Sequence, residues 1–249
     1  MKVGIVGLGL IGGSFAKAYH AAGWEVLAAD IDRQMLDFAM LQGAVNGELT
    51  EDAQADCDLI LIAVYPRAAV EYLQKHGAKI GKKPVVIDCC GTKRVVCEAC
   101  FPLAQEFGFT YLGGHPMAGR ERGGFAHATA DLFRGAHYIL TPDAGVPQES
   151  IRLMERLVTF MGCADVVFSD PAAHDERIAY TSQLMHVMAL ALCDQHLLFD
   201  SYGFEGGSFR GATRVAALDP KLWCELFWAN KETLANLTDE LTERLAEYS

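Results

Sequence analysis

Positive charge is scarce in this sequence, which has 21 lysines and arginines against 32 aspartates and glutamates and a formal net charge of −11. A protein with this excess of negative charge repels both a phosphate backbone and an anionic membrane surface. The composition therefore argues against nucleic acid and membranes as partners. It also means that an anionic small substrate would need arginines of its own, so individual arginines become informative.

Long hydrophobic runs are missing as well. No apolar segment approaches the ~18 residues that a membrane-spanning helix needs. The segment after Met1 has neither the basic stretch nor the cleavage site of a secretory signal. We therefore expect a cytoplasmic protein, and the 249 residues suffice for one large domain or two modest ones.

A disulfide framework or a metal site is not expected from the eight cysteines, because a chain without a secretory signal usually keeps its thiols reduced. Four of them cluster in the sequence and raise the question of zinc: Cys89, Cys90, Cys97 and Cys100. No second CxxC pair or nearby histidine completes a set of four ligands in order. We expect buried free thiols and no metal.

Apolar, β-branched runs alternate with helical patterns through the first half of the chain. The predicted strands are 2–6, 25–29, 58–64 and 84–88, and the predicted helices are 10–22, 33–42, 67–79 and 93–107. Strands that read as continuous apolar segments between helices favour a parallel sheet covered on both faces. The prediction is a Rossmann-type, doubly wound α/β domain.

The pattern changes near residue 169. Short strands are predicted at 110–112, 137–141 and 165–168, with a helix beginning near Pro147. After Pro171 we predict helices alone, over 171–200, near 212–217 and over 220–247, with a glycine-rich break at 203–211. This divides the chain into a dinucleotide-binding domain, 1–169, and an all-helical substrate and dimerisation domain, 170–249.

The last helix carries one apolar stripe, formed by Leu234, Leu237, Leu241 and Leu245. About eighty residues of helix form only a thin core. We therefore expect this domain to bury its apolar face against a second copy of the chain, giving a homodimer.

The segment GLGLIGG at 7–13 contains the GxGxxG pattern, placed between a predicted strand and a predicted helix. Gly7 allows the tight turn, Gly9 lets the backbone approach a pyrophosphate, and Gly12 lets the helix pack closely on the strand. An acid, Asp30, ends the second strand and would accept hydrogen bonds from ribose hydroxyls.

Asp30 would repel a 2′-phosphate and so favours NAD over NADP, although Arg33 three residues later could pair with such a phosphate. The cofactor-binding residues predicted from this pattern are Gly7, Gly9, Leu10, Ile11, Gly12, Asp30, Arg33 and Val64.

The segment GGHPMAGRERGG at 113–124 is predicted to be a loop because of its glycines and proline. It presents His115, whose extended backbone is favoured by Pro116. An imidazole has an unperturbed pKa near 6.5, which suits proton transfer around neutral pH. His115 is thus a candidate catalytic base.

Five segments together resemble the prephenate dehydrogenase family, which includes arogenate dehydrogenases. They are VGIVGLGLIGGSFA (3–16), GGHPMAG (113–119), FRGAHYILTP (133–142), HDERIAYTSQLMHVMALAL (174–192) and FRGATRVAALDPKLW (209–223). The resemblance spans nearly the whole chain, with its motifs in the family's order. We expect neither the fused chorismate mutase nor the C-terminal regulatory domain that some members carry.

This resemblance implies an NAD-dependent oxidative decarboxylation of prephenate to 4-hydroxyphenylpyruvate in tyrosine biosynthesis. It implies that His115 accepts the proton of the ring hydroxyl. Arg214 would bind a substrate carboxylate, with Arg210 four residues earlier in support. His186 and Gln183 would contribute to substrate binding, with Gln183 standing where the family often has histidine.

A further departure lies at DCCGTK, 88–93, where many members carry a serine that hydrogen-bonds the catalytic histidine. Gly91 occupies that position here, and the nearest hydroxyl belongs to Thr92. We expect Thr92 to take over this role.

Other functions stay open at this point. The sequence does not separate prephenate from arogenate as the substrate. A general NAD-linked hydroxyacid dehydrogenase would typically use a lysine base on the long helix, and 171–200 contains no lysine. A non-catalytic module that senses NAD(H) would not need arginines paired with a histidine–proline segment.

Overall fold

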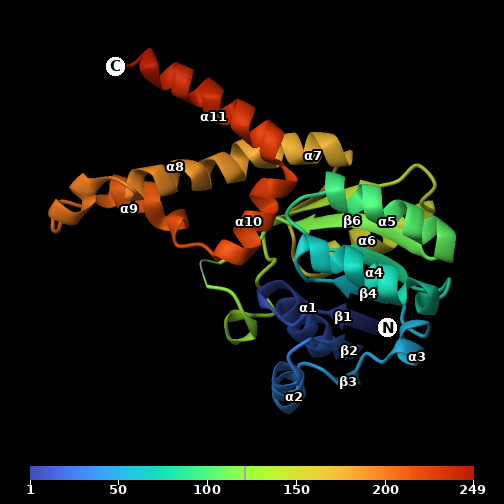
Figure 1. Ribbon diagram of the computed structural model, residues 1–249. Helices are drawn as coiled ribbons and strands as arrows, with labels where there is room; N and C mark the ends of the chain where they lie inside the picture. The colour runs from blue at the N-terminus through green and yellow to red at the C-terminus, as the bar shows by residue number, and fades with distance from the viewer. Residues whose placement is uncertain (121) are drawn as a thin grey trace. The chain divides into compact units, whose positions relative to one another are not determined.

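The computed structural model describes residues 1–120 and 122–249 and divides them into two compact units, Met1–Ala172 and Ala173–Ser249 (Figure 1). The division falls a few residues after the boundary predicted from the sequence. Each unit is described by itself below.

The first unit is built on one eight-stranded sheet in the order β3-β2-β1-β4-β5-β6-β7-β8. Its strands are β1 (Lys2–Val6), β2 (Glu25–Ala29), β3 (Gly47–Glu48), β4 (Leu59–Ile62), β5 (Val85–Asp88), β6 (Thr110–Pro116), β7 (His137–Pro142) and β8 (Asp165–Phe168). Pairing is parallel throughout except between β6 and β7. The doubly wound fold is therefore confirmed, with one antiparallel pair that the sequence did not reveal.

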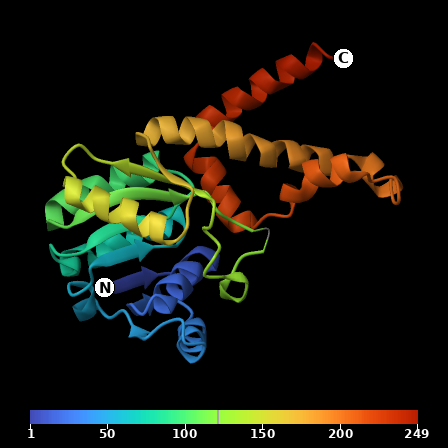
Figure 2. The ribbon, with the colours of Figure 1, turned by 180° about the vertical axis from the view of Figure 1, so that it is seen from behind.

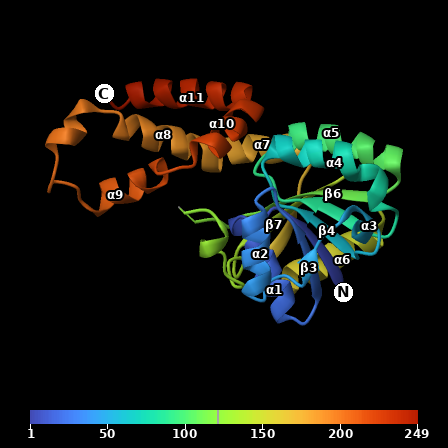
Figure 3. The same ribbon diagram turned by 60° about the horizontal axis from the view of Figure 1, so that its bottom comes forward.

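Helices cover both faces of this sheet, with α4 and α5 on one side and α1, α2 and α6 on the other (Figure 3). Their bounds are α1 (Leu10–Ala21), α2 (Arg33–Leu41), α3 (Glu51–Gln54), α4 (Pro66–Ile80), α5 (Arg94–Phe107), η1 (Phe125–His127) and α6 (Gln148–Phe160). Two buried clusters result. Phe15 and Tyr19 of α1 pack with Val3 and Ile5 of β1 in one, and Leu73 of α4 packs with Ile60 in the other.

The second unit contains only helices. They are α7 (Pro171–Ile178), the π-helix η2 (Ala179–Gln183), α8 (Leu184–Cys193), η3 (His196–Asp200), α9 (Gly207–Thr213), η4 (Arg214–Ala216), α10 (Pro220–Ala229) and α11 (Lys231–Ala246). The elements α7, η2 and α8 follow one another as one continuous helical segment (Figure 2). None of the helices in the described parts of the chain has the length and apolar character needed to cross a membrane.

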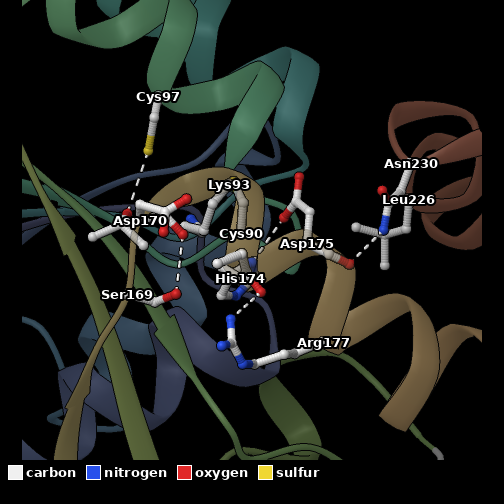
Figure 4. Close-up of polar contacts among 12 residues, drawn as sticks. Cys90, Lys93, Cys97, Ser169, Asp170, His174, Asp175, Arg177, Leu226 and Asn230 are labelled. Atoms are coloured by element: carbon white, nitrogen blue, oxygen red, sulfur yellow. Dashed lines mark hydrogen bonds and ion pairs between the residues drawn. The ribbon is translucent and has the colours of Figure 1, made fainter. Parts of the chain in front are cut away.

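Buried polar contacts surround the π-helical turn between α7 and α8. Asn230, fully buried between α10 and α11, donates through Nδ2 to the carbonyl of Asp175, 2.8 Å, and to Oε1 of Gln183, 3.0 Å (Figure 4). The Gln183 amide donates in turn to the carbonyl of Leu226, 3.2 Å. These bonds tie the end of the π-helix to the junction of the last two helices.

The predicted helices of this half needed correction. The expected continuous helix over 171–200 has a π-helical turn at its centre and its α-helical part ends at Cys193. The expected helix over 220–247 is broken at Asn230, whose φ of −124° is not helical. The predicted glycine-rich break contains most of α9. Contacts between distant segments set these boundaries, and periodicity along the sequence does not report them.

Candidate active site

The glycine loop after β1 has the shape that a dinucleotide requires. Gly7 has φ +92°, and a Cβ there would lie 2.5 Å from the carbonyl oxygen of Ala63 and 2.6 Å from Cγ1 of Val64. A Cβ on Gly12 would lie 1.9 Å from the carbonyl oxygen of Gly7. Gly9, in contrast, faces open space. The loop thus has no room for side chains where it packs on β4. At Gly9 it leaves open space, where a pyrophosphate would approach the start of α1.

Asp30 is held in position by the backbone around it. Its Oδ2 accepts from the amide of Leu8 at 2.6 Å, and its Oδ1 accepts from the amide of Asp32 at 2.9 Å. The carboxylate therefore links the glycine loop to the end of β2 and keeps further lone pairs for ribose hydroxyls. Asp32 caps α2 by accepting from the amides of Gln34 and Met35.

The remaining predicted cofactor residues lie around this loop. Leu10 and Ile11 open α1 and are half-buried, as is Val64 at the end of β4. Arg33 is exposed and forms ion pairs with Asp37 and Glu48. The residues present thus fit a dinucleotide with an unphosphorylated ribose.

His115 lies within strand β6, which corrects the prediction that it stands in a loop. The strand runs to Pro116, and His115 pairs with Ile139 of the antiparallel β7. Its side chain is half-buried at the C-terminal end of the strand. A strand holds an imidazole more firmly than a loop, and such rigidity suits a catalytic base.

The two glycines before His115 serve close packing. A Cβ on Gly113 would lie 2.1 Å from Oγ1 of Thr141, and one on Gly114 would lie 2.6 Å from the carbonyl oxygen of Asp88. Glycine is needed here because the neighbouring strands touch the backbone of β6. The sequence shows the glycines, but the partners that demand them, Thr141, Cys97 and Asp88, lie in other elements of the fold.

A fully buried ion pair is bonded to the backbone next to His115, and the sequence analysis missed it. Asp88 ends β5, and its Oδ1 accepts a hydrogen bond from Nζ of Lys93. Its Oδ2 accepts from the hydroxyl of Tyr111, 2.6 Å, and from the amide of Gly114, 3.3 Å. The last bond joins the carboxylate to the residue next to His115. The signal in the sequence that could have predicted this site is an acidic residue at the end of an apolar run, as in PVVID.

The charge state of this pair follows from its surroundings. Burial lowers the pKa of Lys93, but its buried neighbours, with the Asp88 carboxylate first among them, together raise it by more, so the pKa lies above its ordinary value. Burial and the same carboxylate both raise the pKa of Tyr111. Lys93 is therefore a cation and Tyr111 a neutral donor at neutral pH.

Thr92, expected to hydrogen-bond His115, is fully buried just after β5. Among the described residues its hydroxyl has no hydrogen-bond partner. The expected hydrogen bond between Thr92 and His115 is thus not formed in this structure, and the role of Thr92 stays a prediction.

In the second unit, His186 lies close enough to Arg214 for the charge of the arginine to affect its pKa. Nδ1 of His186 lies 2.8 Å from the carbonyl oxygen of Val215, and its ring lies 3.6 Å from that of Trp223, centroid to centroid. Burial lowers the pKa of His186, the bond to Val215 opposes this, and the positive charge of Arg214 lowers it further. The imidazole is therefore neutral, with the proton on Nδ1 and the lone pair on Nε2.

The arginines themselves are exposed. Arg210 lies in α9, and Arg214 begins the 3₁₀ turn that follows it. Gln183, another predicted substrate residue, is buried. Its Nε2 donates to the carbonyl of Leu226, and its Oε1 accepts a hydrogen bond from Asn230. Its side chain thus has a clear packing role, and its role toward substrate stays a prediction.

All eight cysteines are free thiols. Burial raises the pKa of Cys97 to about 11 and that of Cys100 to about 12. The Sγ atom of Cys97 lies 3.4 Å from Oγ1 of Thr141. Within the described residues no group of three His, Cys, Asp or Glu side chains is arranged to hold a metal ion.

These features define a class of protein. Gly7, Val64, Asp88 and His115 follow or end four strands that run parallel, β1, β4, β5 and β6, so they share the carboxyl edge of the sheet. Ligands of open α/β sheets bind at this edge. With the glycine loop after β1 and the acid Asp30 after β2, the first unit has the features of a dinucleotide-dependent oxidoreductase.

Comparison with known proteins identifies the family. The family model described as "Prephenate dehydrogenase, nucleotide-binding domain" matches residues 15–167, and "Prephenate dehydrogenase, dimerization domain" matches residues 170–249. The chain therefore belongs to the prephenate dehydrogenase family, as its motifs suggested, and it is an NAD-dependent dehydrogenase.

Individual relatives agree with this assignment. Cyclohexadienyl dehydrogenase of Zymomonas mobilis is 31% identical, over 95% of this chain and 83% of its own length. Prephenate dehydrogenase of Lactococcus lactis is 29% identical, over 99% of this chain and 70% of its own. The crystal structure of A. aeolicus prephenate dehydrogenase with hydroxyphenyl propionate and NAD⁺ superposes with a TM-score of 0.88, at 27% identity, over 99% of this chain and 88% of that one.

Proposed function

We propose that this protein catalyses the NAD-dependent oxidative decarboxylation of prephenate to 4-hydroxyphenylpyruvate, a step of tyrosine biosynthesis. The alternative substrate is arogenate, which carries an amino group in place of the keto group of the side chain and would give tyrosine. The observation that carries the proposal is His115 on the same carboxyl edge of the sheet as the glycine loop, with Asp88 bonded to the amide of the preceding Gly114. The relatives named for prephenate and for the cyclohexadienyl ring support the substrate class.

His115 would act as the base. NAD⁺, when bound, supplies the acceptor for the hydride that leaves C4 of the ring. As that hydride departs, positive charge builds at C4, and loss of the hydroxyl proton to His115 relieves it. The ring carboxylate then leaves as CO₂ and the ring becomes aromatic.

Arg214 would bind a carboxylate of the substrate. Its guanidinium offers a planar set of donors that matches a carboxylate. Arg210, four residues earlier and also exposed, would support it, and two arginines suit a dicarboxylate. The lone pair on Nε2 of neutral His186 would accept a hydrogen bond from the substrate.

The experiment that tests this function supplies NAD⁺ with prephenate or with arogenate and follows the absorbance of the reduced cofactor. We expect reduction with prephenate and a kcat/KM for arogenate that is lower. A higher value for arogenate would select the alternative. Failure of both substrates to reduce NAD⁺ would contradict the proposal.

We further propose that the protein is a homodimer formed by its helical domain. Several large apolar side chains of that unit are exposed, among them Leu197 at 73%, Phe199 at 82% and Trp228 at 73%. Within the leucine stripe of α11, Leu234 is buried while Leu245 is 56% exposed. A monomer rarely leaves this much apolar surface in water.

Light scattering at micromolar concentration should therefore give twice the mass of one chain. Replacing both Leu197 and Phe199 by glutamate should weaken the dimer, because two charges would enter an apolar interface. The control is Leu41→Glu, an equally exposed leucine of the first unit, 83% exposed, which should leave the mass unchanged. A monomeric wild type would contradict the prediction.

A further inference from the structure

Arg33 is the residue that leaves the choice of cofactor undecided in the sequence. It is the first residue of α2 and follows directly on the segment that carries Asp30. An arginine near this point of a dinucleotide-binding fold is the group that binds the 2′-phosphate of NADP. Whether Arg33 does so depends on what its guanidinium contacts.

Two carboxylates hold the guanidinium of Arg33. Its Nε donates to Oδ1 of Asp37 at 3.1 Å, one turn along α2. Its Nη1 donates to Oε2 of Glu48 at 2.5 Å. Both bonds and the nearby negative charges raise the pKa of Arg33, led by the bond to Glu48. The positive charge of Arg33 is thus balanced by two carboxylates in the absence of any ligand.

Glu48 reaches Arg33 because of the sheet. It lies on the edge strand β3 and pairs with Ala28 of β2, two residues before Asp30. The edge strand therefore places a second acid beside the ribose-binding acid. Asp37 and Glu48 hold the guanidinium, and Asp30 and Asp32 lie within three residues of Arg33 in the sequence, so acids outnumber the arginine in this region.

We propose that Glu48 is a second determinant of cofactor specificity, which acts by withholding Arg33 from a 2′-phosphate. This inference rests on the NAD-dependent function given above and adds the residue that enforces it. A 2′-phosphate would have to displace two carboxylates from Arg33 and then lie among their uncompensated charges. Asp37 assists Glu48 in the same way.

The ion pairs are exposed, and solvent exposure limits the free energy that each pair contributes. The side chains of Arg33, Asp37 and Glu48 are 62%, 59% and 49% exposed. Exposed pairs contribute little to folding. Their effect on specificity is separate from stability, because it is measured against a ligand that competes for the same guanidinium.

The test measures dissociation constants of NAD⁺ and NADP⁺ by calorimetry, with no substrate present. Glu48→Gln should raise the affinity for NADP⁺ relative to NAD⁺ about fivefold, the factor that corresponds to an exposed charged contact. Adding Asp37→Asn should raise it further. The control, Glu98→Gln, removes the same charge from an exposed position on α5 and should leave the ratio as in the wild type.

A second substitution shows whether the effect passes through Arg33. In the Glu48→Gln background, Arg33→Gln should abolish the gain in NADP⁺ affinity. In the wild-type background the same substitution should change NADP⁺ affinity less than about twofold, because Arg33 is already engaged.

Two outcomes would overturn the proposal. One is a loss of NADP⁺ affinity on Arg33→Gln that is equal in the two backgrounds, since Arg33 would then bind the phosphate in the wild type. The other is an NADP⁺ to NAD⁺ ratio that Glu48→Gln changes no more than Glu98→Gln does. Because binding is measured without turnover, a protein that binds NAD⁺ but oxidises neither substrate would overturn the proposed function and leave this inference standing.

Discussion

His115→Asn should lower kcat by roughly 10²–10⁴, the usual span for general acid–base catalysis. Asparagine keeps a hydrogen-bonding side chain at the end of β6 but cannot accept the hydroxyl proton. KM should change little, because the substrate carboxylates are bound elsewhere. Steady-state kinetics with prephenate and NAD⁺ measure both constants. The rate of the wild type should also rise with pH near neutrality, as a base deprotonates, and this limb should vanish in the variant.

Two further variants give this result its meaning. His137→Asn changes an exposed histidine on the neighbouring strand β7, which is ion-paired with Asp165 at the surface, and should leave kcat unchanged. Arg214→Ala should chiefly raise KM, since it removes binding shared by the ground state and the transition state. If His115→Asn retains most of its kcat, the base lies elsewhere, and His186 is the first residue to test.

Asp88→Asn should lower the free energy of unfolding by about 3–5 kcal/mol, because it leaves the ammonium of Lys93 buried without its counter-charge. Both side chains of the pair are fully buried. Urea denaturation at pH 7 measures the change. The substitution also perturbs the acceptor of the Gly114 amide, so kcat should fall together with stability.

The pH dependence of this effect has a definite sign. In the wild type the pKa of Lys93 is raised, so its contribution to stability is present below the pKa of the unfolded lysine and is lost as pH rises through the folded value. Without Asp88, burial dominates and the pKa of Lys93 falls below that of the unfolded chain. The unfolded state then binds more protons, so the stability of Asp88→Asn should rise with pH up to about 10, the ordinary lysine pKa.

An exposed pair provides the matched control for this prediction. Glu71→Gln breaks an ion pair with Arg67 on α4, whose side chains are 59% and 82% exposed. It should change the free energy of unfolding by less than about 1 kcal/mol. A loss of similar size in Asp88→Asn, or a deficit that does not shrink at high pH, would show that the buried pair does not carry the stability assigned to it.

The sequence predicted the first half of the fold well because its signals there are local. Strands β1 and β2 have the predicted bounds, and α1, α2, α4 and α5 begin and end within one or two residues of prediction. An apolar run between helical patterns identifies a buried parallel strand without knowledge of its neighbours. The glycine loop and Asp30 were found in the same way, because GxGxxG and the acid that follows keep a fixed spacing.

The sequence failed where long-range contacts set the structure. The glycines at 113 and 114 read as a loop, but they belong to β6 because Thr141 and Asp88 leave no room for side chains. The two-residue strand β3, with Glu48, has no periodicity that could reveal it. The helix over 171–200 contains a π-helical turn tied by Asn230, which lies 47 residues beyond Gln183.

What the sequence determined by itself is therefore the class of fold, the dinucleotide loop, the family and the identity of the candidate base, since each depends on residues close together in the chain. Only the tertiary structure decided that His115 stands on a strand, that Asp88 and Lys93 form a buried pair bonded to the Gly114 amide, and that Arg33 is held by Glu48. The physical reason is that packing and charge pairing depend on distance in space. The sheet brings Glu48 to Arg33 and Asp88 to Gly114, and no local pattern records those distances.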